Sequence, residues 1–143
     1  MLTDAEWIDY DNDNDIDLIV VGQWMPITIF ENNDNRFTKN LKLGLNNSNG
    51  WWNTLEVADI DNDGILELLI SHGEIGLQKL TLYNANIVKK KNFIRIKPFN
   101  KNGAPARGAT VTLISNKRKH AKTIDSGSGY LCQMEPVAHY GIR

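Results

Sequence analysis

The chain has few of the features that crosslink a fold or carry it into a membrane. Its single cysteine, Cys132, excludes an internal disulfide framework. The longest apolar run, residues 16–21, is interrupted by Asp17 and is far shorter than a bilayer requires. The N-terminal residues lack the basic and apolar regions of a signal peptide. Sustained helical spacing of apolar residues is also missing, so β-strands are the expected elements.

Two acidic segments of one design occur at residues 9–17 and 59–67. Carboxylates recur at positions 1, 3, 5 and 9 of both segments. So many like charges on so short a segment repel one another unless a cation lies among them. Calcium, with a flexible shell of about 6–8 oxygen ligands, suits them best. Each segment therefore predicts a calcium loop.

Three interpretations of these loops compete. An EF-hand needs a bidentate glutamate at position 12 and flanking helices, but that position holds Val20 in one loop and Ile70 in the other. A solvated acidic turn without metal is disfavoured because the strict spacing occurs twice. The third is a nine-residue calcium loop between two strands, with side-chain ligands at positions 1, 3, 5 and 9 and a carbonyl at position 7. Gly64, and Asn14 in the first loop, suit a left-handed backbone at position 6.

The surrounding sequence repeats together with the loops. A compact apolar strand follows each loop, at residues 18–21 and 68–70, and a further strand follows at 27–30 and 80–83. A period near fifty residues with several strands per unit is typical of propeller blades. A propeller closes with about four to eight blades, and this chain holds fewer than two. We expect an all-β fold of β-propeller-type blades, an incomplete propeller, followed by a small β domain.

Charge and strand pattern both change near residues 86–92. Residues 1–88 carry fifteen Asp and Glu against four Lys and Arg, whereas residues 89–143 carry two against twelve. We expect the blades in residues 1–88 and a second β unit in residues 92–143, which stops without an obvious finish. The basic clusters lack a recognition helix, a zinc finger or a stacked-aromatic motif, so nucleic acid is not an expected partner.

The acidic loops and their strands resemble the FG-GAP/VCBS repeat of integrin-α-like β-propellers, in which such a loop lies between two strands of a blade and binds calcium. The resemblance covers residues 58–68 and, in a second copy, residues 7–21. Asn14 in place of glycine and Glu67 in place of aspartate depart from the family pattern. The resemblance implies two structural calcium ions. It places their ligands on the side chains of Asp9, Asp11, Asp13, Asp17, Asp59, Asp61, Asp63 and Glu67 and on the carbonyls of Asp15 and Ile65.

Residues 100–111, 126–131 and 139–141 are similar to the ASPIC/UnbV domain that follows such repeats in many secreted proteins. Together the two resemblances imply the C-terminal section of a larger protein, truncated at both ends, that needs further blades from its parent chain. They also imply an extracellular, periplasmic or cell-surface location.

The remaining residues give little support to catalysis. Cys132 and His139 could act as a nucleophile and a base, but no third group orients them, so a structural role is expected. The four tryptophans could stack on sugars, yet in blades they more often fill space between sheets. We therefore expect a calcium-binding, non-catalytic repeat module for an unknown extracellular protein or glycan. The alternative is an appendage of a secreted polysaccharide-processing enzyme.

Overall fold

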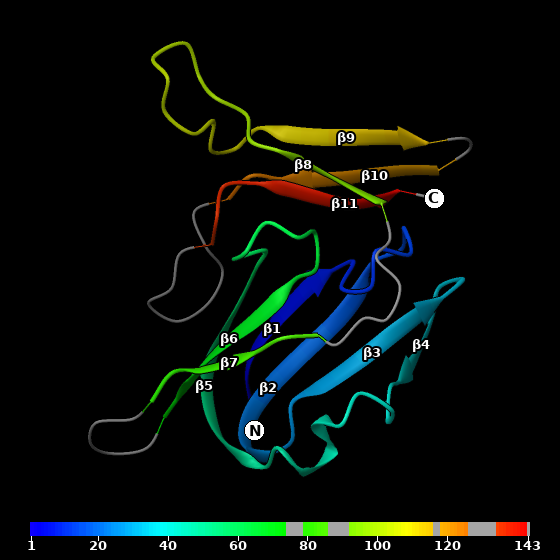
Figure 1. Ribbon diagram of the computed structural model, residues 1–143, viewed down its shortest axis with the longest axis vertical. Coiled ribbons are helices and arrows are strands. Elements are labelled where there is room, and N and C mark those ends of the chain that lie inside the picture. The colour runs from blue at the N-terminus through cyan, green and yellow to red at the C-terminus, as the bar shows by residue number, and fades with distance from the viewer. Residues whose placement is uncertain (74–78, 86–91, 116–117, 126–133, 143) are drawn as a thin grey trace.

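The chain folds into antiparallel β-sheets (Figure 1). Within the described residues the helical structure is limited to one 3-10 turn, η1 (Leu45–Asn47). The all-β prediction is therefore confirmed. Cys132 and the Gly/Ser-rich stretch at 126–131 lie outside the described part of the chain. The computed structural model describes residues 1–73, 79–85, 92–115, 118–125 and 134–142.

The first acidic loop joins the first two strands of a four-stranded antiparallel sheet. The strands are β1 (Leu2–Ile8), β2 (Asp17–Met25), β3 (Thr28–Asn33) and β4 (Arg36–Lys39), and they pair in chain order. The two residues between β3 and β4 both adopt left-handed φ values, as a two-residue hairpin turn requires. This sheet is the first blade.

The second acidic loop occupies the same place in a second sheet. That sheet contains β5 (Gly50–Ala58), β6 (Glu67–His72) and β7 (Thr81–Tyr83), again paired in chain order. A short ladder between β2 and β5 joins the two sheets. Strands β5, β6 and β7 thus repeat β1, β2 and β3, as the fifty-residue period predicts. The joined sheets do not close, so the chain forms propeller-type blades of an incomplete propeller.

Apolar side chains from both blades meet in one core. Ile19 and Val21 of β2 and Ile70 of β6 are fully buried, and Trp52 of β5 belongs to the same core. Burying one such side chain contributes about 1.5–3 kcal/mol to stability. The shared core therefore fixes the two blades against each other and sets where their acidic loops lie.

The other tryptophans lie outside this core. Trp7 packs edge-on against Phe37, and the ring centroid of Trp24 lies 5.8 Å from that of Trp51. Trp24 is 75% exposed and has a left-handed φ of 56° at an irregularity in the β2–β5 ladder. Trp52 fills space between the sheets as expected, whereas Trp24 is mostly exposed where β2 meets β5.

Two strand pairs make up the C-terminal unit. β8 (Asn92–Ile96) pairs with β11 (Ala138–Ile142), and β9 (Thr110–Ser115) pairs with β10 (Arg118–Thr123). In Figure 1 this unit lies over the end of the blades where β1 and β5 finish. That end carries both acidic loops.

Tyr140 joins the two strand pairs to each other. Its hydroxyl donates to the carbonyl oxygen of Val111 at 2.7 Å and accepts from the backbone N–H of Lys122 at 3.1 Å. The ring is buried with Ile124 and Ala138 in a second, smaller core. The small β domain predicted from the sequence is therefore present.

Candidate metal centre

The first acidic loop winds around the carboxylate of Asp9, which follows β1 directly and is buried. Asp9 Oδ1 accepts from the backbone N–H of Asp13 at 2.8 Å, and Oδ2 accepts from that of Asn14 at 3.0 Å. Each bond turns the chain back toward its start. The carboxylate at position 1 is therefore the centre of the loop's fold.

The second loop is built in the same way around Asp59. Asp59 Oδ2 accepts from the backbone N–H of Gly64 at 3.1 Å. Glu67 Oε2, at position 9, accepts from the backbone N–H of Ile60 at 2.8 Å. The two loops thus share the bonds from position 6 to position 1 and from position 2 to position 9, which supports a shared role. They differ at position 5, because the N–H of Asp63 donates to Asp61 Oδ1 at 3.1 Å and not to Asp59.

Left-handed residues shape both loops. Asn14 and Gly64 have φ values of 71° and 84°, which confirms the left-handed backbone predicted at position 6. Asn12 and Asn62 have φ values of 56° and 61°, a second left-handed position that the sequence analysis missed. The available signal was asparagine at position 4 of both loops, because asparagine adopts this conformation more readily than most residues with a side chain.

The described residues contain two clusters of carboxylates with one oxygen per residue within 4.8 Å of the others. Such clusters could hold a metal ion, and each draws on positions that the sequence predicts as ligands. Their members are Asp9, Asp11 and Asp13 in the first loop and Asp59, Asp61 and Glu67 in the second.

The other four predicted ligand residues lie outside these clusters. Asp17 accepts from two backbone N–H groups, that of Asn32 at 2.8 Å and that of Tyr10 at 3.4 Å. Asp63 Oδ1 accepts from the backbone N–H of Ile65 at 2.8 Å. Asp17 and Asp63 therefore brace the loops, and their roles as ligands remain predictions. The same holds for the carbonyls of Asp15 and Ile65.

Asp59 provides a test of whether the residues fit a cation. Its side chain is fully buried, and Oδ2 accepts from Gly64 and from the guanidinium of Arg95. Oδ1 is buried with no hydrogen-bond partner among the described residues. Leaving such an oxygen unsatisfied costs about 1–3 kcal/mol or more. A hard cation bound at Oδ1 would satisfy it, so the site fits calcium.

Three of the loop carboxylates, Asp9, Asp17 and Glu67, lie where their charged forms are disfavoured. Burial raises the pKa of Asp9 to about 6, and the nearby charge of Asp11 adds to the effect. Burial raises the pKa of Asp17 to about 7, with smaller contributions from Asp11 and Asp15. The pKa of Glu67 is also raised, mainly by burial and then by the charges of its own loop. A bound dication would reverse these penalties.

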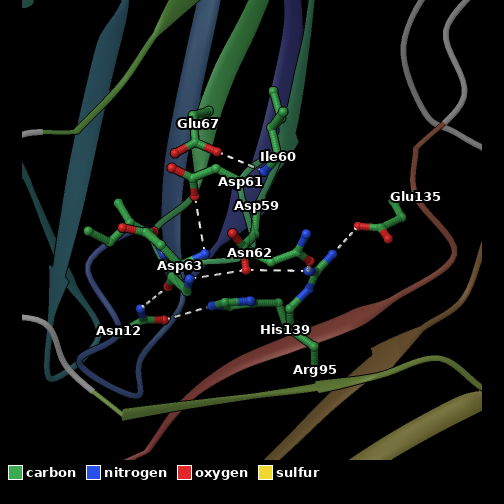
Figure 2. A network of polar contacts seen from close by, with 12 residues as sticks. Asn12, Asp59, Ile60, Asp61, Asn62, Asp63, Glu67, Arg95, Glu135 and His139 are labelled. Carbon is green, nitrogen blue, oxygen red and sulfur yellow. Dashed lines mark hydrogen bonds and ion pairs between the residues drawn. The ribbon is translucent and has the colours of Figure 1, made fainter.

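Residues of the C-terminal unit reach both loops. Burial lowers the pKa of His139 to about 4, so its imidazole is neutral at pH 7, and its Nε2 lies 2.8 Å from Asn12 Oδ1. Arg95 donates to Asn62 Oδ1 at 2.7 Å (Figure 2). The sequence analysis did not place these residues at the loops. The only available signal was the opposite charge of the two parts of the chain.

Two families account for most of the chain. Residues 9–70 match the family described as FG-GAP-like repeat, and residues 99–143 match the family described as ASPIC and UnbV. The chain therefore joins an FG-GAP-like repeat region to an ASPIC/UnbV region, and both resemblances stated from the sequence are confirmed. Such regions are extracellular-type repeat and interaction modules that are generally non-catalytic.

Three curated proteins match part of the chain. The chain is 49% identical over 87 residues to cartilage acidic protein 1 of Xenopus tropicalis, a match covering 60% of this chain and 13% of that protein. It is 48% identical over 87 residues to the proteins of the same name from Mus musculus and Homo sapiens, covering 60% of this chain and 14% and 13% of them. The matched part is thus a small fraction of these relatives. Among the described residues, no helix is long and apolar enough to span a membrane.

Proposed function

We propose that this chain is a calcium-binding, non-catalytic module of a longer extracellular protein, and that each acidic loop holds one structural Ca²⁺. The buried Oδ1 of Asp59, which has no hydrogen-bond partner among the described residues, carries the proposal. The equivalent hydrogen bond from Asn14 to Asp9 and the carboxylate cluster of the first loop extend the proposal to that loop. We assign the ions to the ten residues predicted above. Calcium then offsets the repulsion within each loop and keeps the strands on either side in register.

Isothermal titration calorimetry of the full chain tests the proposal. We expect two calcium ions per chain, because the two loops have the same construction. Magnesium is expected to bind more weakly, because it demands a smaller, near-octahedral site. Heats of calcium addition that match those of buffer dilution would disprove the function proposed here.

The proposed domain boundaries are residues 1–88 for the blades and 92–143 for the ASPIC/UnbV unit.

The outward face of the first blade supports the proposal that further blades pack against it in the longer protein. Trp7, Leu18 and Phe30 are cross-strand neighbours on that face, and Trp7 is 55% exposed. A row of apolar side chains on a sheet face is typical of a packing surface. The partner of the assembled module is proposed to be an extracellular protein or a glycan.

Calcium affinity of the first loop is expected to fall about a hundredfold between pH 7.5 and pH 5.5. The pKa values of Asp9 and Asp17 are raised to about 6 and about 7, so both carboxyl groups take up protons within this window. Calcium must then displace those protons, and affinity decreases as the pH falls. Calorimetry at pH 6.5 in two buffers of different ionisation enthalpy should detect proton release. An affinity that does not change with pH would contradict the prediction.

A further inference from the structure

Strands β8 and β11 lie across the acidic loops, and β11 makes direct hydrogen bonds to the first of them. The backbone N–H of Gly141 donates to Asp9 Oδ2 at 3.0 Å, and His139 Nε2 lies 2.8 Å from Asn12 Oδ1. There is no spare room at this contact, since a Cβ added to Gly141 would lie 2.5 Å from the backbone of Asn12. One strand of the C-terminal unit thus touches the residue at the centre of the loop.

The same strand pair also covers the second loop (Figure 2). Arg95 of β8 donates to Asn62 Oδ1 at 2.7 Å and to Asp59 Oδ2 at 3.3 Å. The ring of Phe93 lies against Gly64, where an added Cβ would come within 1.9 Å of it. Phe93 also stacks on His139, with ring centroids 5.5 Å apart and planes at 8°.

The two loops are joined beneath this strand pair. Asn12 Nδ2 donates to the carbonyl oxygen of Gly64 at 2.7 Å. The side chain of Asn12 therefore bonds both to the other loop and to β11. Because Asn12 and Gly64 are left-handed residues, the surface that receives β8 and β11 exists only while both loops keep their folded shape.

We propose that the β8–β11 pair docks on both acidic loops as one surface, so that calcium occupancy of the loops and docking of the C-terminal unit are coupled. This inference rests on the proposed calcium function. It adds that the β8–β11 pair responds to calcium binding. Coupling of this kind is reciprocal: if calcium tightens docking, docking tightens calcium binding by the same factor.

Two effects of calcium on docking oppose each other. Removing metal leaves the loops more negative, which increases their attraction for the basic C-terminal unit. Removing metal also lets the clustered carboxylates push the loops open, which displaces Asn12 and Gly64. On the side of the C-terminal unit the described contacts are mostly uncharged and short-range, since Gly141 offers an N–H and Phe93 a ring, while Arg95 brings a charge. At physiological salt the long-range attraction is screened beyond about 8 Å. The loop shape therefore dominates, and calcium strengthens docking.

The test compares Phe93→Ala with a matched control, Phe99→Ala, in the full chain. Phe99 is a phenylalanine of the same unit that is 58% exposed. Calorimetry is expected to show calcium affinity about five- to tenfold lower in Phe93→Ala and unchanged in Phe99→Ala. Gly141→Ala replaces no proposed ligand but forces β11, whose Gly141 N–H bonds to Asp9, away from Asn12, and it is expected to lower the affinity similarly.

Amide hydrogen exchange measures docking of the β8–β11 pair independently of the calcium titration. We expect calcium to slow exchange across residues 138–142 of the wild type, including the Gly141 amide that bonds to Asp9. In Phe93→Ala the same residues should exchange faster than in Phe99→Ala. Calcium that binds wild type and both variants equally, or that leaves exchange at 138–142 unchanged or faster, would refute the coupling but not the calcium function. A wild type that binds no calcium would refute both.

Discussion

Calcium is expected to raise the thermal unfolding midpoint of the metal-free protein by roughly 10–20 °C. An ion that binds only the folded chain stabilises it by about 2.7 kcal/mol when its free concentration is 100-fold above Kd. Two loops therefore add about 5 kcal/mol, and 1 kcal/mol shifts the midpoint of a chain near this size by roughly 2–4 °C. Differential scanning calorimetry in a chelator and in excess calcium measures the difference directly.

The size of this shift depends on the free energy of calcium binding, which includes relief of the unfavourable burial of carboxylates in the metal-free protein. Without metal, Asp59 Oδ1 is a buried oxygen with no hydrogen-bond partner among the described residues, and the buried Asp9 and Asp17 resist ionisation. Sodium chloride at matched ionic strength is the control, because general screening would stabilise the acidic part of the chain without occupying a site. Equal midpoints in chelator and calcium would contradict the prediction, as would an equal shift from sodium chloride.

The acidic loops and the repeat could be predicted from the sequence because their signals are local. The spacing of carboxylates fixes the loop, and the compact strands after each loop fix β2 and β6. Gly64 marks a left-handed backbone by its residue type alone. The second left-handed position was missed because no single-residue rule requires it: Asn12 and Asn62 are polar residues among many in an acidic loop.

The placement of the C-terminal unit could not be predicted, because its contacts join residues far apart in the chain. His139 and Asn12 are separated by 127 positions, and Gly141 and Asp9 by 132. No pattern in either segment identifies its partner. The close fit of Phe93 on Gly64 likewise depends on how two units meet. Opposite net charge predicts attraction between the units but not which strands touch which loops.

Replacing Asp59 with asparagine is expected to abolish measurable calcium binding at the second loop. Asparagine has nearly the same shape and keeps one oxygen to accept from Gly64, so the loop can still fold. It removes the charge and replaces one carboxylate oxygen with an amide group that cannot bind a cation. The loss of a group next to a ligand typically costs about 10–100-fold in metal affinity, so the loss of a ligand itself should cost at least about 100-fold.

Calorimetry should therefore show one binding event in Asp59→Asn and two in the wild type. Asp34→Asn is the matched control, because Asp34 is an exposed aspartate in the β3–β4 turn, away from both carboxylate clusters.

The thermal midpoint of Asp59→Asn in chelator shows whether Asp59 is a metal ligand or only a hydrogen-bond acceptor that supports the fold. If Asp59 is a ligand, the variant in chelator loses no more stability than the weakened pair with Arg95 accounts for, and the calcium-dependent gain in the midpoint is halved. A variant that still binds two ions, or that is destabilised equally with and without calcium, would show that Asp59 serves the fold alone.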